Sequence, residues 1–324
     1  MLNRRGFLVT AASLAGAGLL PARAADAQKI SVGINAWIGY GPWYIAKEKG
    51  LDLANGIDID FVNLSSNDDF KSTLAAGSVD STHALITSAL QYQAAGIKFR
   101  IALFQDISTT ADAIIATPDI TTLADLKGKT VGVPKESGGE YLLRLVLEPV
   151  GLTLDDLNLL DMQADQAAVA FIAGRVDAAV SYEPYIANAK NEVDGVVTLA
   201  TAADVPGVIS DIWLVTEDLM SEHPDAIVGM LRAWDAGVKA LRADTEDGLE
   251  TIAKATNTTA DDLRGTFAGV ELYDLSEGLA FMQNDLAELG GRIESIMRAN
   301  DGLDGPTDFA ALIDTSFAER ALGS

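Results

Sequence analysis

Residues 70–82 read FKSTLAAGSVDST, and residues 169–180 repeat the same arrangement as VAFIAGRVDAAV. In each stretch a helical pattern ends at a glycine, Gly77 or Gly174, which is followed by x-Val-Asp and a strand pattern. Glycine is favoured at a helix end because it adopts a positive φ without steric cost. Such junctions also recur by chance in α/β proteins. The repetition predicts two equivalent α/β lobes whose strand ends face each other across a cleft, where open α/β sheets bind ligands.

Strand and helix patterns alternate through the first two thirds of the chain. Strands are predicted at 30–34, 57–62, 101–104, 113–116 and 130–133, and helices at 45–49, 70–76 and 140–150. This alternation predicts an α/β fold with short strands buried under helices. From about residue 221 the pattern becomes helical, with strand signals nearly absent. The helices predicted there span residues 224–242, 248–256, 260–267 and 276–289.

The first 24 residues have the features of an export signal. Arg4-Arg5 precedes an apolar run at 7–20, and Ala22-Arg23-Ala24 forms a small-x-small cleavage site. The run is too short and too rich in Gly and Ala to span a bilayer, which needs about 20 strongly apolar residues. The arginine pair favours the route that exports folded proteins. An ordinary helix with a basic start is the alternative. We expect a mature, soluble periplasmic protein that begins near Ala25.

The composition excludes several classes of function. The chain has 47 acidic residues against 23 Lys and Arg, a net charge of −24, which removal of residues 1–24 would change to −27. Such a charge repels phosphate backbones, so no nucleic-acid partner is expected. With no cysteine and two histidines, thiolate and histidine-rich metal sites are excluded. The hydrolase and nucleotide-binding motifs Gly-x-Ser-x-Gly, His-Glu-x-x-His and the Walker loop are absent. We therefore expect no cofactor and no catalysis.

Residues 39–51, GYGPWYIAKEKGL, resemble the opening of the nitrate/sulfonate/taurine-type periplasmic solute-binding proteins, a family that includes binders of pyrimidine precursors. Further matches to this family follow in its usual order. They are AGSVD at 76–80, ADAI at 111–114, DLKGK at 125–129, GVPKES at 132–137 and EPY at 183–185. The resemblance covers the chain from about residue 30 to about residue 220.

This resemblance implies a type II periplasmic-binding-protein fold with two α/β lobes and two crossing segments. Lobe one would comprise residues 27–113 plus 213–324, and lobe two residues 114–212. It also implies a monomer that closes around a small solute and delivers it to the ABC permease of an importer in the inner membrane. A sensor that docks on a signalling receptor is an alternative. A pyrimidine synthase on the same fold is another, but that enzyme group is cytosolic and consumes its own histidine with a pyridoxal cofactor.

Two groups of candidate ligand contacts belong to lobe one. Trp37 and Tyr40 are expected to face the cleft, because aromatic rings can stack on a planar or cationic group. Trp43 and Tyr44, from the same turn, are expected in the core. Ser65 and Asn67 stand beside a helix N-terminus, a position that suits an anionic group. Ser66, between them, offers a further hydroxyl, and plain helix capping is the alternative that would explain one of these three residues.

Ser137 and Gly138 present the same choice in lobe two, since the glycine would let a ligand approach the backbone amides. Sulfonate binders of this family often carry Ser-Ser/Thr-x-His here. Glu140 stands at the histidine position and Gly138 replaces a hydroxyl, which argues against a plain alkanesulfonate or nitrate. His83 and Thr87 are predicted to line the cleft floor after the first x-Val-Asp strand, with a purely structural histidine as the alternative.

Three acids, Asp106, Glu183 and Asp211, are predicted near the cleft, where Lys135 is the obvious cation. A buried carboxylate without a positive partner is costly, and a bound ammonium would compensate it. A solvated loop position is the alternative for Glu183. The predicted ligand is therefore a small amine-bearing sulfonate of the taurine type. A pyrimidine precursor or another nitrogenous small molecule is the second choice.

Overall fold

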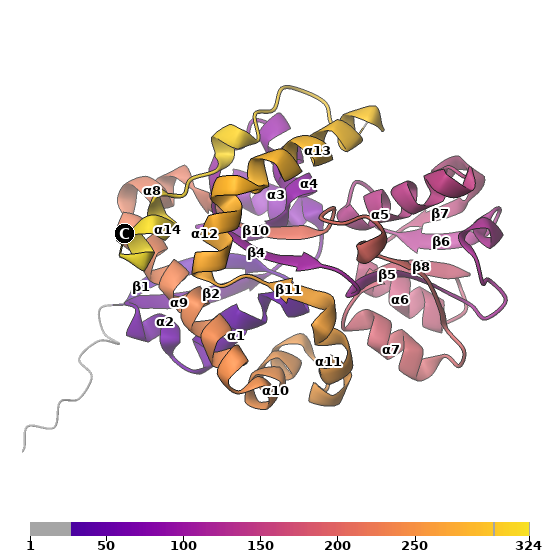
Figure 1. The fold of residues 1–324 in the computed structure, drawn as a ribbon, viewed down its shortest axis with the longest axis horizontal. Coiled ribbons are helices and arrows are strands. Elements are labelled where there is room, and N and C mark those ends of the chain that lie inside the picture. Colours follow the sequence, from indigo (N-terminus) through magenta and orange to yellow (C-terminus); the bar gives the residue numbers. More distant parts are fainter. Residues whose placement is uncertain (1–26, 301, 324) are drawn as a thin grey trace, which may run out of the picture.

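The computed structural model describes residues 27–300 and 302–323. Two mixed β-sheets, each covered by helices, build the molecule (Figure 1), and the predicted α/β class is confirmed. The predicted export signal at residues 1–24 lies outside the described residues. Within the described ranges, each helix is too short or too polar to cross a bilayer.

The larger sheet has the strand order β11-β4-β10-β3-β1-β2. Its strands are β1 (Gln28–Ile34), β2 (Ile57–Asn63), β3 (Ser81–Leu85), β4 (Phe99–Ser108), β10 (Ser210–Thr216) and β11 (Val270–Leu272). β1 lies parallel to β2 and β3, whereas β10 runs antiparallel to β3 and β4. Strand β10, which follows lobe two in the chain, therefore sits in the middle of a sheet that the first third begins.

The smaller sheet has the strand order β7-β6-β8-β5-β9. Its strands are β5 (Asp112–Ala116), β6 (Thr130–Val133), β7 (Asn158–Asp161), β8 (Ala178–Tyr182) and β9 (Val197–Thr201). β6 is parallel to β7 and β8, and β5 is antiparallel to β8 and β9. This sheet comes from one continuous stretch of chain.

Helices flank both sheets (Figure 1). We call the larger sheet with its helices lobe one and the smaller sheet with its helices lobe two. The helices of lobe one are α1 (Gly41–Glu48), α2 (Leu51–Ala54), α3 (Asn67–Ala75), α4 (Ile86–Ala94), α8 (Glu217–Glu222), α9 (Pro224–Ala243), α10 (Thr245–Thr256), α11 (Ala260–Thr266), α12 (Leu275–Asn284), α13 (Leu286–Ala299) and α14 (Ser316–Leu322). Those of lobe two are α5 (Gly138–Leu147), α6 (Ala164–Ile172) and α7 (Tyr185–Glu192).

The described chain passes between the lobes twice. It leaves lobe one between β4 and β5, at residues 109–111, and returns between β9 and β10, at residues 202–209. We propose to divide the lobes within these two connections, because β5 begins at Asp112 and β10 begins at Ser210. The boundaries predicted at 113/114 and 212/213 fall just inside these strands.

The repeated sequence builds the same junction in both lobes. Gly77 and Gly174 have φ values of 62° and 64°, the left-handed conformation that favours glycine. The aspartate of each x-Val-Asp stretch then accepts a backbone hydrogen bond from the neighbouring parallel strand. Asp80 Oδ2 lies 2.7 Å from Ser31 N, and Asp177 Oδ2 lies 2.8 Å from Thr130 N. Each lobe thus fixes its central strands by the same device.

Trp43 occupies the centre of the lobe-one core. Its side chain is fully buried, and its ring centroid lies 5.6 Å from that of Trp213 and 5.2 Å from that of Trp234. The indole N–H donates to Gln105 Oε1 at 2.8 Å, so its polar atom is satisfied. Trp43 therefore belongs to the core.

The structure corrects three local predictions. The helix predicted at 276–289 is two helices, because Asp285 leaves helical geometry with φ −122° between α12 and α13. Both helices bury one apolar face, so their pattern continues through the break. The short strand β11 lies where only helices were predicted. His83 belongs to β3, where it pairs with Trp213, and Thr87 belongs to α4, so neither lies in a loop after the strand.

Candidate functional site

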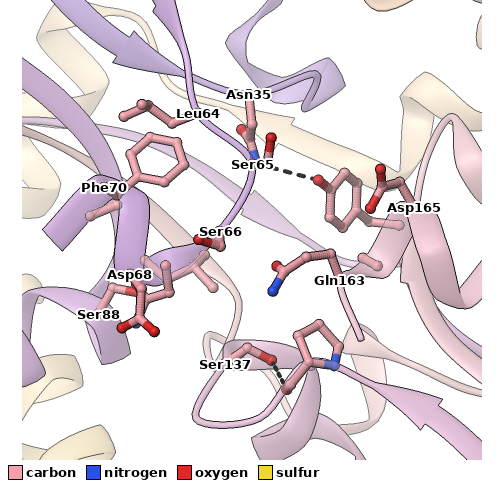
Figure 2. A pocket seen from close by; sticks show the side chains of 18 of the residues that line it. Asn35, Leu64, Ser65, Ser66, Asp68, Phe70, Ser88, Ser137, Gln163 and Asp165 are labelled. Carbon is pink, nitrogen blue, oxygen red and sulfur yellow. Dashed lines mark hydrogen bonds between the residues drawn. The ribbon is translucent and has the colours of Figure 1, made fainter. Parts of the chain in front are cut away.

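A cavity of about 580 Å³ lies between the two lobes. Residues from the two equivalent strands line it: His83, Ala84 and Leu85 from β3, and Val180, Ser181 and Tyr182 from β8. In Figure 2 the labelled side chains of lobe one face those of lobe two across this space. Ligand pockets for small molecules have volumes of about 300–1,000 Å³, so the cavity suits a small ligand.

Both lobes contribute polar and aromatic side chains to the cavity wall. The lining residues are Asn35, Ala36, Tyr40, Asn63, Leu64, Ser65, Ser66, Asn67, Asp68, Phe70, His83, Ala84, Leu85, Ser88 and Tyr92 from lobe one, and Asp112, residues 134–139, Asp161, Gln163, Ala164, Asp165, Val180, Ser181, Tyr182 and Tyr185 from lobe two. Of the predicted contacts, this wall includes Tyr40, Ser65, Asn67, His83, Ser137 and Gly138. It does not include Trp37, Thr87, Asp106, Glu183 or Asp211.

The N-terminus of α3 meets the cavity in lobe one. The Ser66 hydroxyl caps this helix by accepting a hydrogen bond from Asp69 N at 3.1 Å. The Asp69 carboxylate in turn accepts a hydrogen bond from Ser66 N, which completes a capping box. Asn67 donates to Gln91 and accepts from the Tyr92 hydroxyl at 2.7 Å, so its side chain is held by the protein. Ser65 is exposed at the cavity wall. Capping therefore accounts for Ser66, one of the three residues of this segment for which capping was the alternative.

The N-terminus of α5 lies on the opposite side of the same cavity. Ser137 donates to Pro134 O at 2.7 Å and accepts from Glu140 N at 3.2 Å, so its hydroxyl caps the helix (Figure 2). A Cβ added to Gly138 would lie 2.5 Å from Leu85 Cδ1 and 2.8 Å from Ile209 Cδ1. A larger residue here would have to displace the ends of the Leu85 and Ile209 side chains, so glycine favours this close approach of α5 to β3 of the other lobe. Ser137 satisfies the first-turn amide of Glu140, whereas the amides of Gly138 and Gly139 have no partner within the helix and are available to a ligand.

Tyr40 and His83 form one wall of the cavity. Their rings stack with centroids 4.2 Å apart and planes inclined by 26°. Burial lowers the pKa of His83 to about 3, although the neighbouring Gln105 amide works in the opposite direction, so the imidazole is neutral. Neither ring nitrogen has a hydrogen-bond partner among the described residues. A neutral imidazole offers one donor and one acceptor, which a ligand can satisfy.

Asp112 places a carboxylate in the cavity wall, at the first residue of β5. Its backbone N–H donates to Ser108 Oγ at 3.0 Å, but its Oδ2 has no partner among the described residues. Burial raises the pKa of Asp112 to about 7; the Ser108 hydroxyl lowers it and the charge of Glu183 raises it further. A buried carboxyl oxygen without a donor is costly, and a ligand N–H group would satisfy it.

Asn35 and Tyr182 join the two lobes beside Asp112. Asn35 Nδ2 donates to the Tyr182 hydroxyl at 3.3 Å, the bond drawn as a dashed line from Asn35 in Figure 2. The edge of the Trp37 ring also meets Tyr182 across the lobes, at a centroid distance of 5.7 Å. Asn35 Oδ1 is buried without a partner among the described residues. A second hydrogen-bond acceptor thus lies in the same wall as Asp112.

Asp106 and Asp211 lie beneath this wall. Both are buried and face each other on β4 and β10, where Trp37 donates to Asp106 and the Tyr40 hydroxyl donates to Asp211. Glu183 is also buried, and its Oε2 accepts from Ala187 N at 2.9 Å inside lobe two. Thr87 is buried in α4. None of these four side chains lines the cavity.

Charge is unevenly distributed over the cavity wall. Lys135 is the one cationic residue among the described lining residues, against the carboxylates of Asp68, Asp112, Glu136, Asp161 and Asp165. Asp112 alone of these five is buried. No set of three or more acidic or histidine side chains in the described part of the chain is arranged to hold a metal ion.

Sequence reasoning missed many contributors to the cavity, among them Asn35, Asp112 and Tyr185. A signal for Asp112 was available, because it is the only charged residue in the apolar strand Asp112–Ala116. The match of residues 111–114 to a family pattern included this aspartate without assigning it a role. Asn35 follows the first strand directly, where strand ends supply ligand contacts.

Comparison with known proteins identifies relatives along most of the chain. A candidate binding protein of Brucella abortus (strain 2308) is 31% identical over 256 residues, which cover 78% of this chain and 79% of that protein. The riboflavin-binding protein RibY of Chloroflexus aurantiacus is 25% identical over 305 residues, covering 86% of this chain and 82% of its own length.

Solved structures confirm the periplasmic-binding-protein fold. The alkanesulfonate-binding protein SsuA of Xanthomonas axonopodis pv. citri, bound to MOPS, superposes with a TM-score of 0.76 at 20% identity, over 90% of this chain and all of that chain. The nitrate-binding protein NrtA of Synechocystis PCC 6803 superposes with a TM-score of 0.73 at 14% identity, over 92% of this chain and 89% of that chain. The family model described as NMT1/THI5 like matches residues 37–247, and the chain belongs to this family.

Proposed function

We propose that this protein is the periplasmic solute-binding component of an ABC importer and captures a small amine-bearing ligand between its lobes. Relatives and structural neighbours are named as binders of sulfonate, riboflavin or nitrate, which supports a binding role without a catalytic step. The predicted export signal supports a periplasmic location, where a permease of the inner membrane would receive the ligand.

The observation that carries the ligand class is the unpartnered Oδ2 of Asp112. An ammonium group beside this oxygen would satisfy a hydrogen bond and neutralise a buried charge together. Asn35 Oδ1 offers a second acceptor in the same wall. Tyr40 and Tyr182 supply ring surfaces beside these acceptors, and aromatic faces attract cations.

An anionic group at the other end of the ligand fits the start of α5. Ser137 and Gly138 bring first-turn amides to the cavity wall, Lys135 stands in the same wall, and helix N-termini favour negative charge. A ligand with an ammonium at one end and a sulfonate at the other would use both features. The taurine-type ligand predicted from the sequence is therefore our first choice.

A pyrimidine precursor is the second candidate, and a different observation favours it. The stacked rings of Tyr40 and neutral His83 line the cavity, where a planar heterocycle could pack against them. Ring amino groups could donate to Asp112 and Asn35, and His83 could pair with a ring nitrogen. The two candidates share the amine and differ in the flat ring and the anionic group.

A ligand screen by thermal unfolding tests this proposal. Taurine should stabilise the protein by about 2.7 kcal/mol at 100 times its dissociation constant. Isethionate, in which a hydroxyl replaces the ammonium of taurine, is the matched control and should bind at least about tenfold more weakly, since a charge-assisted bond of about 1.5–3 kcal/mol is lost. A hydroxymethylpyrimidine amine represents the second candidate. The proposal fails if isethionate, ethanesulfonate or nitrate gives the largest shift.

Binding should also depend on pH through Asp112. Its pKa of about 7 means that the carboxyl is protonated below this pH in the free protein, whereas an ammonium ligand requires the carboxylate. The affinity should fall by about tenfold for each pH unit below 7, because the proton must leave before the ligand binds. Titration calorimetry in two buffers of different ionisation enthalpy would detect that proton release. An affinity that is constant from pH 5 to pH 8 would contradict this assignment.

A further inference from the structure

We propose that Asp106 and Asp211 share one proton at the junction of the two lobes and position Tyr40 at the ligand cavity and Trp37 at the contact between the lobes. They are positioning residues, since neither lines the cavity. The effect of the pair on ligand affinity rests on the proposed binding function. The geometry of the pair does not, because it exists without a ligand.

The two aspartates lie beside the two connections between the lobes. Asp106 lies near the end of β4, just before the chain enters lobe two, and Asp211 lies near the start of β10, just after it returns. They are direct cross-strand partners, and the pairing of β4 with β10 becomes irregular immediately after them. The exposed fraction is 0% for Asp106 and 3% for Asp211, so water does not screen the pair.

Residues 37–40 close over this carboxyl pair. Trp37 Nε1 donates to Asp106 Oδ1 at 3.2 Å, and the Tyr40 hydroxyl donates to Asp211 Oδ1. Between them, a Cβ added to Gly39 would lie 2.6 Å from Asp106 Oδ2 and 2.3 Å from Trp37 Nε1. The backbone can therefore lie against the pair only because residue 39 is glycine.

The aromatic residues carry this arrangement to the cavity and to the second lobe. Tyr40 lines the cavity and stacks on His83, while Trp37 contacts Tyr182 of lobe two. Any change at the carboxyl pair thus reaches the ring wall that the ligand meets and the contact that joins the lobes.

The surroundings of the pair leave it short of positive charge. The titratable groups that face the pair directly are Asp112 from β5 and Tyr40. The groups next to these two are His83 and Tyr182, which lie near Tyr40, and Glu183, whose charge acts on Asp112. Burial is the main cause that raises the pKa of Asp106, and the charge of Asp211 raises it further. Burial also raises the pKa of Asp211 to about 8, although the hydrogen bond from Tyr40 acts in the opposite direction. Two adjacent buried carboxyls cannot both ionise, so one proton stays between them at neutral pH.

Retention of this proton has a defined sign for stability. The folded protein holds a proton that an unfolded carboxyl releases near its ordinary pKa of about 4. The contribution to stability is therefore complete below that pH and is lost as the pH rises through about 8. Loss of the proton would add negative charge to a buried pair and loosen the segment that holds Tyr40.

Urea unfolding of the ligand-free protein between pH 5 and pH 9 tests the pair directly. Asp106→Asn supplies a permanent N–H donor in place of the shared proton. The wild-type folding equilibrium constant should fall relative to this variant by up to about tenfold per pH unit between pH 5 and pH 8. Asp211→Asn gives an independent second variant, and Asp218→Asn on the exposed start of α8 should follow the wild type. Identical pH profiles for wild type and both pair variants would overturn the inference.

Taurine affinity between pH 7 and pH 8.5 gives the functional readout. We expect the taurine affinity of the wild type to decline several-fold over this pH range. The affinity of Asp106→Asn should not change with pH over the same range. If taurine binds neither protein at any pH but the stability profiles differ, the ligand proposal fails and the carboxyl pair stands. If taurine binds both proteins with the same pH dependence and the stability profiles coincide, the carboxyl pair is wrong and the binding function stands.

Discussion

Replacement of Asp112 by asparagine is expected to weaken binding of an amine-bearing ligand between about 30-fold and about 5,000-fold, which corresponds to about 2–5 kcal/mol for removing one partner of a buried charge pair. The carboxamide keeps the shape of the side chain but carries no charge, so only the interaction with the ligand ammonium is lost. Titration calorimetry with taurine would measure the change. The same substitution should abolish the loss of affinity below pH 7.

Asp165→Asn is the matched control for this experiment. Asp165 lines the same cavity but is exposed, and an exposed ion pair contributes about 0–1 kcal/mol. Equal losses for the two variants would show that the ligand responds to overall charge and not to the buried oxygen of Asp112.

Loss of folding would not explain the expected result for Asp112→Asn. Because the pKa of Asp112 is raised to about 7, its contribution to stability is present below the ordinary carboxyl pKa and is lost as the pH rises through 7. Asparagine does not ionise and avoids this loss. At pH 8 the variant should therefore be at least as stable as the wild type in urea unfolding.

Replacement of Trp43 by alanine should give the largest loss of stability, about 3–5 kcal/mol, because a large buried ring is removed and leaves a cavity. Trp43 is fully buried against Trp213 and Trp234, and its loss would also leave Gln105 Oε1 without its donor. A typical domain has a free energy of unfolding of about 5–15 kcal/mol, so this loss takes a large share. Urea unfolding would measure it.

Two further variants separate the causes of that loss. Trp43→Phe keeps a ring in the core but removes the N–H group, and it should cost about 1–3 kcal/mol for the unsatisfied Gln105. Val169→Ala, at a side chain that is 65% exposed, should stay within about 0.5 kcal/mol. A loss below about 1 kcal/mol for Trp43→Ala would contradict the central place of this ring in the core.

The sequence predicts much of this fold because many helix and strand boundaries are specified by a few neighbouring residues. The junctions at Gly77 and Gly174 require a positive φ and a following strand, and both appear in the structure as predicted. The break at Asp285 was not predictable from the same kind of signal, since α12 and α13 both continue the helical apolar pattern. The short strand β11 depends on its pairing with β4, a contact that the sequence of Val270–Leu272 does not reveal.

The candidate site was harder to predict than the fold because it depends on contacts between distant segments. Acidic residues near the strand connections were recognised, but Asp106 and Asp211 turn toward each other under Trp37 and Tyr40, whereas Asp112 faces the cavity. Which side of a strand faces the cleft is set by register and by the placement of both lobes. Neighbouring residues in the sequence therefore do not reveal which side chains face the cleft.

The position of β10 between β3 and β4 has a consequence for the order in which the chain acquires its structure during synthesis. Lobe two is made from the continuous stretch 112–201 and can fold as soon as that stretch has left the ribosome. Lobe one must wait until Ser210–Thr216 has been made, because its sheet lacks a central strand until then. The half of the protein that begins first therefore finishes last. The Arg4-Arg5 pair predicts a translocation route that exports folded proteins. Such a route would allow β10 to be synthesised and paired before export.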